Sequence, residues 1–383
     1  MAKTQAEAAN AQWRGWTALL VDGPVGATDA VEQMHMAVLG AMGPFSPVAK
    51  LATGGVAKAV YRGVRGGMRG VGALADMTLR VAGHPSPLGE GAEKARAIVN
   101  GVLGDHLVAT ANPLALPMTL RRTDNPPTGR LLVLVHGLCM SDRGWTRRGH
   151  DHGERLAREQ GWSPHYLSYN SGEHISTNGR ALATMLEDLL ATWPLPVERL
   201  AIVGHSMGGL VARSACHYGE LAGNSWVKRL DSLVFLGTPH NGAPLERIGH
   251  WTDGVVGRFS FLAPFVRLGR ARSAGIVDLR YGHLRDEDHL AGADRQPVPL
   301  PPGVNCFAIA ATTAEKVGGL KARLIGDGLV PIDSALGRHP DPRYDLGIPP
   351  ANIWVGTGMG HFDLLDRRAV YERIAEWLSK GAR

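Results

Sequence analysis

The chain has 383 residues, of which 44% are hydrophobic and 20% are charged, and its formal net charge is +6. This length is sufficient for two structural units, and the composition is that of an ordinary globular protein. The small excess of 41 Lys and Arg over 35 Asp and Glu does not indicate nucleic-acid binding. No apolar run reaches the ~18 residues of a transmembrane helix, and the N-terminus lacks the order of a secretory signal. A cytoplasmic protein is therefore expected.

The three cysteines, Cys139, Cys216 and Cys306, are widely spaced and odd in number. They form no CxxC pair and no cluster with histidines at metal-ligand spacing, so neither a disulfide framework nor a zinc site is expected. The simplest interpretation is that all three are reduced and buried. No cofactor is indicated.

Residues 1–125 are rich in Ala, Gly, Val and Met and show helical spacing. Residues 31–39 are expected to form one helix, and residues 56–83 a longer one. In the longer helix an apolar side faces a basic side: Val60, Val64, Met68 and Val71 against Arg62, Arg65 and Arg69. This pattern fits packing on the rest of the protein, with solvated arginines. It also fits peripheral contact with an anionic membrane, or dimerisation.

The turn-forming stretch NPPTG, residues 125–129, leads into a region where short apolar runs alternate with helical stretches. The expected strands are 131–137, 165–170, 199–206, 230–239, 304–312 and 352–358, and the expected helices are 181–190, 210–221 and 370–378. Several strands are nearly continuous apolar runs, as in parallel strands buried on both faces. We therefore expect residues 126–383 to form a doubly wound, mostly parallel α/β sheet, after an N-terminal helical extension.

Residues 243–303 interrupt this alternation, and a segment of about 60 residues is too long for an ordinary connection. A cap or lid insertion is expected there. Its apolar part offers side chains for an acyl chain: Phe259, Phe261, Leu262, Phe265 and Val266. Packing of these residues into the core fits as well. The polar stretch 272–292 is expected to form a solvated helix and turns.

The sequence GHSMGG, residues 204–209, lies between a predicted strand and a predicted helix. That is the context of a nucleophile elbow, in which the serine of G-x-S-x-G is exposed at the carboxyl end of a sheet. Gly204 and Gly208 avoid a collision where strand and helix converge, and the helix N-terminus points backbone N–H groups at the site. Ser206 is therefore the candidate nucleophile.

In this architecture the triad follows the chain order Ser, acid, His. His361 is the only histidine after the last predicted strand and is the candidate base. Other histidines are placed less well: His205, His240, His283 and His289. Asp327, in IGDGLVP, lies between the last two predicted strands and is the candidate acid that orients the base, with Asp333 and Asp363 as alternatives.

An oxyanion site is expected in the loop VHGLCMSD, which follows the first predicted strand of this region. A turn at His136 and Gly137 would let the backbone N–H of Leu138 face the substrate, with the N–H of Met207 as its partner. Cys139 lies close by but has no assigned base, so a packing role is expected for it.

The motifs VHG, GHSMGG, GTPHNGAP, GDGLVP and GH resemble those of the α/β-hydrolase superfamily, over residues 126–383. More narrowly, GTPHNGAP and DGLV resemble the lipase and esterase branch that includes bacterial triacylglycerol lipases and the GPI inositol-deacylase-like hydrolases. This resemblance implies a carboxylic ester hydrolase with the triad Ser206, Asp327 and His361, acting on an ester or lipid-like substrate. Thioesterase or acyltransferase chemistry on the same triad, and a non-catalytic membrane scaffold, stay as alternatives. Some bacterial lipases hold calcium near the acid loop, but no second aspartate completes such a site here, so no metal is expected.

Overall fold

The computed structural model describes residues 7–22, 62, 66, 89–244, 273–289, 295–315 and 326–380. These residues fall into two compact units. The described residues of the first unit are 7–22, 62, 66, 89–96 and 106–115, and the rest belong to the second unit. The candidate site residues that the structure describes all lie in the second unit.

In the first unit, residues 7–22 form a helix, as do both ends of α4 (Glu90–Ala109). Gln12 donates a hydrogen bond to Glu93 over 3.1 Å. The Arg96 guanidinium donates to three successive carbonyl oxygens, those of Pro113, Leu114 and Ala115. This unit is therefore held together by hydrogen bonds between segments that are far apart in the sequence.

The basic helix expected at 56–83 lies outside the described residues, apart from Arg62 and Gly66, which are helical. The helix expected at 31–39 also lies outside them. Among the helices that are described, none combines the length and the apolar character that a membrane crossing needs. The packing and membrane interpretations of the basic helix both stay predictions.

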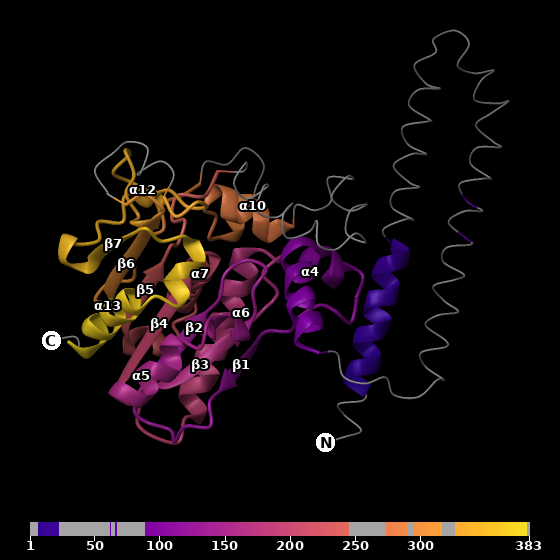
Figure 1. The fold of residues 1–383 in the computed structure, drawn as a ribbon, viewed down its shortest axis with the longest axis horizontal. Helices are drawn as coiled ribbons and strands as arrows, with labels where there is room; N and C mark the ends of the chain where they lie inside the picture. Colours follow the sequence, from indigo (N-terminus) through magenta and orange to yellow (C-terminus); the bar gives the residue numbers. More distant parts are fainter. Residues whose placement is uncertain are drawn as a thin grey trace, which may run out of the picture. The chain divides into compact units, whose positions relative to one another are not determined.

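A seven-stranded sheet with the order β1-β3-β2-β4-β5-β6-β7 forms the centre of the second unit (Figure 1). Its strands are β1 (Thr119–Arg122), β2 (Arg130–Val135), β3 (Ser163–Ser168), β4 (Arg199–His205), β5 (Leu230–Leu236), β6 (Asn305–Thr312) and β7 (Ile353–Thr357). Neighbouring strands pair in parallel, except that β1 pairs antiparallel with β3 at the edge. Strands β2 to β7 confirm the six predicted strands.

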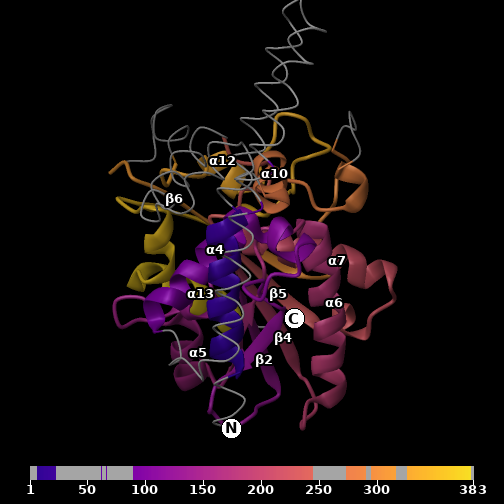
Figure 2. The ribbon, with the colours of Figure 1, turned by 90° about the vertical axis from the view of Figure 1, so that its right-hand side faces the viewer.

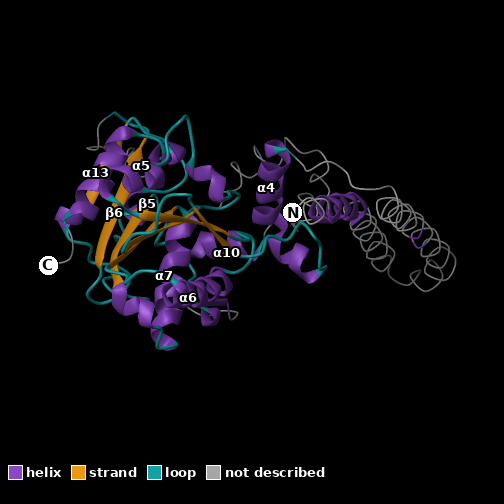
Figure 3. Ribbon diagram, turned by 90° about the horizontal axis from the view of Figure 1, so that it is seen from below, coloured by secondary structure: helices purple, strands orange, loops and turns teal. Residues whose placement is uncertain are grey.

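Helices cover both faces of this sheet (Figure 3). On one face lie α5 (His152–Gln160) and α13 (Arg368–Ser379), and on the other lie α6 (Ile175–Thr192) and α7 (Met207–Leu221). The short helices α10 (Ala274–Tyr281) and α12 (Ile332–Ala335) lie beyond the carboxyl ends of the parallel strands (Figures 1 and 2). Single turns of 3-10 helix complete the described part: η3 (Asp142–Trp145), η4 (Ser225–Arg229), η6 (Asp286–His289), η7 (Pro350–Asn352) and η8 (His361–Leu365). The predicted helices at 181–190, 210–221 and 370–378 are confirmed within α6, α7 and α13.

The central strands are buried on both faces because helices cover both. In β2 every residue after Arg130 is buried, and in β4 every residue after Arg199. Each Val or Leu buried in this way stabilises the fold by about 1.5–3 kcal/mol. Between the sheet and α13, the Phe307 and Trp377 rings stack at a centroid distance of 4.8 Å. The free cysteines Cys139, Cys216 and Cys306 are buried, as predicted.

The stretch 272–292 is less solvated than its composition predicts. Its helix α10 is present, but Gly275, Ile276, Asp278 and Leu279 are buried. The backbone N–H of Gly275 donates to the carbonyl oxygen of Gly172, and α10 thus packs on the loop that follows β3. The expectation of a solvated helix is wrong on this side, because a charged residue such as Asp278 finds polar partners in the protein interior.

Candidate active site

Ser206 occupies the turn between β4 and α7. Its backbone has φ 54° and ψ −125°, a conformation that a residue with a Cβ rarely adopts. The N–H of Ser206 donates to the carbonyl oxygen of Leu236 on β5 over 2.8 Å, which fixes the strained turn to the sheet. Backbone strain of this kind is maintained where the surrounding structure over-determines the geometry, and it concentrates at functional sites.

Two glycines allow the strand and the helix to meet at this turn. A Cβ on Gly204 would lie 2.6 Å from the Cα of Gly209, and a Cβ on Gly208 would lie 2.1 Å from the carbonyl oxygen of Val135. Both distances are far below van der Waals contact, so neither position accepts a side chain without a backbone shift. The geometry therefore agrees with the expectation that Gly204 and Gly208 avoid a collision between the strand and the helix.

His361 and Asp327 form a buried pair. His361 Nδ1 lies 2.7 Å from Asp327 Oδ2, and the two residues are 5% and 4% exposed. The other carboxylate oxygen, Oδ1, accepts hydrogen bonds from the backbone N–H groups of Leu329 and Val330 over 3.0 and 2.8 Å. A proton on Nδ1 that faces a carboxylate leaves Nε2 of the neutral imidazole as a proton acceptor.

The two alternative acids have other partners. Asp363 accepts a hydrogen bond from the backbone N–H of Gly360 and pairs with Arg148. Asp333 lies 4.0 Å from Arg338. Of the three aspartates that the sequence offered, Asp327 is the one that the structure places against His361.

Ser206 and His361 line one pocket. Its walls are mainly apolar and include Leu138, Met140, Pro239, Ala243, Leu279, Leu329, Val330 and Phe362. Gly237, with φ +58°, lies beneath the pair of base and acid: a Cβ there would lie 3.1 Å from Asp327 Oδ2 and 3.2 Å from His361 Cε1. The pocket thus combines a serine, an imidazole and an apolar surface.

The loop after β2 passes directly against the serine. A Cβ on Gly137 would lie 3.0 Å from the Cβ of Ser206, and Leu138 lines the pocket. Met207 is the first residue of α7, and the first N–H groups of a helix have no partner within it. In the described part of the chain, neither the N–H of Leu138 nor that of Met207 has a hydrogen-bond acceptor. Both are therefore able to donate to a ligand.

The side chains around this loop are held in place by buried contacts. The Tyr169 hydroxyl donates to the carbonyl oxygen of His136 over 2.7 Å, and the backbone N–H of Cys139 donates to Ser171 Oγ over 3.1 Å. Burial raises the pKa of the Cys139 thiol, which disfavours a thiolate nucleophile there. This agrees with the packing role expected for Cys139.

His205, which the sequence offered only as a poorer candidate for the base, is a neighbour of the site and lines the same pocket. Its Nε2 lies 3.2 Å from the carbonyl oxygen of His361, and the two ring centroids are 4.7 Å apart. Burial, followed by the charge of His361, lowers the pKa of His205 well below its usual value. A neutral His205 can donate from Nε2 to that carbonyl and so support the backbone at His361. The expected contact residues Phe259, Phe261, Leu262 and Phe265 lie outside the described residues.

Part of this chain is similar to known proteins. Residues 126–254 match the family model of the PGAP1-like alpha/beta domain. No curated protein matches the sequence. Among solved structures, the mature Bacillus licheniformis lipase BlEst2 is 18% identical, with a TM-score of 0.43 and coverage of 68% of this chain and 98% of that one.

Two further solved structures show the range of similar proteins. The Pyrococcus furiosus esterase Pf2001 is 15% identical, with a TM-score of 0.39 and coverage of 67% of this chain and 84% of that one. The type II thioesterase YbtT from the yersiniabactin pathway is 13% identical, with a TM-score of 0.38 and coverage of 68% and 95%. Such distant likenesses carry no argument about the substrate of this chain.

The fold itself is well defined by the order and direction of the strands. A mostly parallel sheet carries an antiparallel strand at one edge, helices on both faces, and a strand–serine–helix turn at the end of a central strand. This arrangement is that of the nucleophile-elbow enzymes. This chain therefore has the α/β-hydrolase fold, and its residues 126–254 are similar to the PGAP1-like alpha/beta domain.

Proposed function

We propose that this protein is a serine hydrolase that cleaves carboxylic esters through an acyl-enzyme on Ser206. The observation that carries the proposal is the 2.7 Å hydrogen bond between Asp327 and a His361 that shares a pocket with Ser206. A base oriented by a carboxylate and placed beside a serine is what activates a hydroxyl for attack on a carbonyl carbon.

The proposed reaction has two halves. His361 Nε2 takes the proton of Ser206 as Oγ attacks the ester carbonyl, and the backbone N–H groups of Leu138 and Met207 stabilise the oxyanion. The tetrahedral intermediate then expels the alcohol, which receives the proton from His361. Water attacks the acyl-enzyme in the second half and gives its proton to His361. The acid leaves, and the proton returns to Ser206. Asp327 holds the imidazole tautomer throughout.

The pocket walls support a proposal for the substrate class. Leu138, Met140, Leu279 and Phe362 suit an apolar acyl group and offer no charged partner. We also propose that residues 243–303 act as the cap, because Ala243 and Leu279 belong to that segment and line the pocket. An ester with an apolar acyl chain is therefore the proposed substrate.

Replacement of Ser206 by Ala tests the proposal. In Ser206→Ala we expect hydrolysis of p-nitrophenyl esters to fall by several orders of magnitude, up to roughly 10⁶-fold. Covalent labelling by a fluorophosphonate probe should be lost as well. Ser232→Ala is the matched control, because Ser232 is buried but does not line the pocket. Full labelling of Ser206→Ala would contradict the assignment of the nucleophile.

A second measurement separates the alternatives on the same triad. Rates on p-nitrophenyl esters from acetate to palmitate should be compared with rates on acyl thioesters of the same chain lengths. A preference for oxygen esters supports an esterase or lipase, and activation by a lipid–water interface with long chains supports a lipase. A strong preference for thioesters would replace the proposed substrate class but keep the triad.

A further inference from the structure

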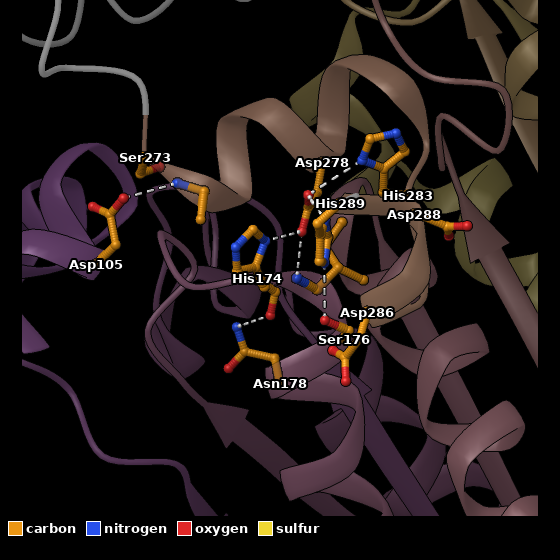
Figure 4. Close-up of polar contacts among 12 residues, drawn as sticks. Asp105, His174, Ser176, Asn178, Ser273, Asp278, His283, Asp286, Asp288 and His289 are labelled. Carbon is orange, nitrogen blue, oxygen red and sulfur yellow. Dashed lines mark hydrogen bonds and ion pairs between the residues drawn. The ribbon is translucent and has the colours of Figure 1, made fainter. Parts of the chain in front are cut away.

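Three histidines and one aspartate lie close together in the second unit (Figure 4), and none of them lines the catalytic pocket. His174 immediately precedes α6, Asp278 lies on α10, His283 follows that helix, and His289 ends η6. The Asp278 side chain is fully buried, whereas the three imidazoles are partly exposed. The sequence did not predict this cluster, because His174 is about 100 residues away from the other three members and the four follow no ligand-spacing motif.

The distances within the cluster are short enough for its atoms to bind a single ion. His174 Nδ1 lies 3.1 Å from Asp278 Oδ2, and His289 Nδ1 lies 3.2 Å from Asp278 Oδ1. His283 Nδ1 lies 3.6 Å from the same Oδ1. Bonds of ~2.0–2.1 Å to a tetrahedral zinc ion place neighbouring ligand atoms ~3.3 Å apart. His174, Asp278 and His289 offer ligand atoms that all lie within 4.8 Å of one another.

Hydrogen bonds alone do not satisfy these atoms. Asp278 Oδ2 accepts from the backbone N–H of Ile175 over 2.8 Å and lies against His174. Within the described chain, Asp278 Oδ1 and His283 Nδ1 are buried and make no hydrogen bond of good geometry, although Oδ1 lies 3.2 Å from His289 Nδ1. A buried polar atom left in this state costs about 1–3 kcal/mol. A cation at the point where these atoms converge would accept their lone pairs and remove that cost.

Ion pairing is a poor alternative account. If all three imidazoles were protonated to pair with Asp278, three positive charges would face one negative charge. The His174 and His289 ring centroids are only 3.8 Å apart, so two of those positive charges would repel each other at close range. Neutral imidazoles avoid this repulsion, either as Nδ1–H donors to Asp278 or as ligands of a divalent cation, and metal binding separates these two arrangements.

The surroundings of His289 orient its ring in the manner of a metal ligand. His289 Nε2 lies 3.1 Å from Ser176 Oγ. Ser176 Oγ can accept a hydrogen bond from His289 Nε2–H at this distance. This leaves a lone pair on Nδ1, and metal-binding histidines are commonly oriented by such a hydrogen bond from the second ring nitrogen.

We propose that His174, Asp278 and His289 bind a Zn²⁺ ion, with His283 as the fourth ligand. Imidazole nitrogens with one carboxylate suit zinc, whereas calcium and magnesium take oxygen ligands. The ion would join the N-terminus of α6 to α10 and η6. Because Leu279 lines the catalytic pocket and follows Asp278 directly, the ion would also hold that pocket wall in place.

The test is Zn²⁺ binding by the full chain after removal of metals with EDTA, measured by competition with a chromophoric chelator. We expect one tightly bound Zn²⁺ per chain. His174→Gln and His289→Gln should each weaken binding by more than the ~10–100-fold that loss of an outer partner causes. His217→Gln is the matched control, because His217 is half-buried on α7 outside the cluster. Binding that is equally tight in His289→Gln and in the unchanged chain would overturn the proposal, as would the absence of tight binding.

Two further readouts are independent of ester hydrolysis. Co²⁺ in place of Zn²⁺ should give the visible absorption of a tetrahedral ion in the unchanged chain and in His217→Gln, but not in His289→Gln. Zn²⁺ should raise the Tm of the first two proteins and leave that of His289→Gln unchanged. If His289→Gln and the unchanged chain have the same Tm without metal, the loss of binding is not a loss of folding. A Zn²⁺-induced rise in Tm that persists in His289→Gln would place the ion elsewhere.

Discussion

At the scale of single residues, Asp327 has two tasks. Oδ2 accepts from His361 Nδ1, while Oδ1 holds the backbone of Leu329 and Val330. Under the proposed function, Asp327→Asn should keep the fold but lower kcat by roughly 10⁴-fold, because an amide that donates to Nδ1 selects the wrong imidazole tautomer. The measurement is kcat on a p-nitrophenyl ester, together with the Tm.

Asp363→Asn is the control for this change. Asp363 is two residues beyond His361 but bonds to Gly360 and Arg148 instead of the imidazole. We expect its effect on kcat to be less than tenfold. An Asp363→Asn variant that loses as much activity as Asp327→Asn would show that the orienting acid has been assigned wrongly.

The sequence could place some residues of the site but not others. Ser206, Asp327 and His361 belong to local motifs in a fixed chain order, and the structure brings Ser206 and His361 into one pocket and bonds Asp327 to His361. Their catalytic roles stay predictions until activity is measured. The contact between His205 and the His361 carbonyl, and the convergence of three histidines on Asp278, come from tertiary packing, which no local pattern records.

At the scale of elements, the strands that the sequence predicted are those with strong local signals. β2, β4 and β5 are nearly continuous apolar runs, because they are buried on both faces of the sheet. β1 reads TLRR and is largely exposed, so it has neither an apolar run nor an alternating pattern. It forms because β3 offers a free edge to pair with, and Arg121 lies over the Tyr166 ring at 4.4 Å. Edge pairing of this kind depends on the partner strand and could not be predicted locally.

The contact between α6 and α7 gives a prediction about packing. A Cβ on Gly179 of α6 would lie 2.1 Å from Ser214 Oγ on α7, and that hydroxyl already donates to the carbonyl oxygen of Leu284. Alanine improves helix propensity by up to about 1 kcal/mol, but overpacking costs about 1–3 kcal/mol. We therefore expect Gly179→Ala to lower the free energy of unfolding, as measured by urea denaturation.

Gly91→Ala on α4 is the control, because a side chain at Gly91 would meet no neighbouring atom. No atom lies within 4 Å of a Cβ built on Gly91, so only the gain in helix propensity remains. Its unfolding free energy should be unchanged or higher. Stabilisation of both variants would contradict the prediction. It would mean that α6 and α7 can move apart enough to accept a methyl group at Gly179.

At the scale of the whole molecule, several histidines are buried in the neutral state. Burial lowers the pKa of His136 and of His152 to about 4, and it lowers the pKa values of His205 and His240 well below their usual range. In the unfolded chain the same imidazoles take up a proton near pH 6.5. Between these values the unfolded state binds more protons than the folded state, so the unfolding free energy falls as the pH falls.

The share of His152 in this loss of stability can be isolated. Because the folded pKa is depressed, its stabilising contribution is complete above pH 6.5 and declines as the pH falls towards 4, at about 1.4 kcal/mol per pH unit. Between pH 7.5 and pH 5.0 the unchanged chain should therefore lose about 2 kcal/mol more unfolding free energy than His152→Gln, whose amide does not titrate. Urea denaturation at the two pH values measures this difference, and the lower absolute stability of the variant cancels in the comparison. Equal losses in the two proteins would mean that His152 is protonated in the folded state at pH 5.0. That result would contradict the burial of its ring, whose Nε2 contacts the carbonyl oxygen of Leu364.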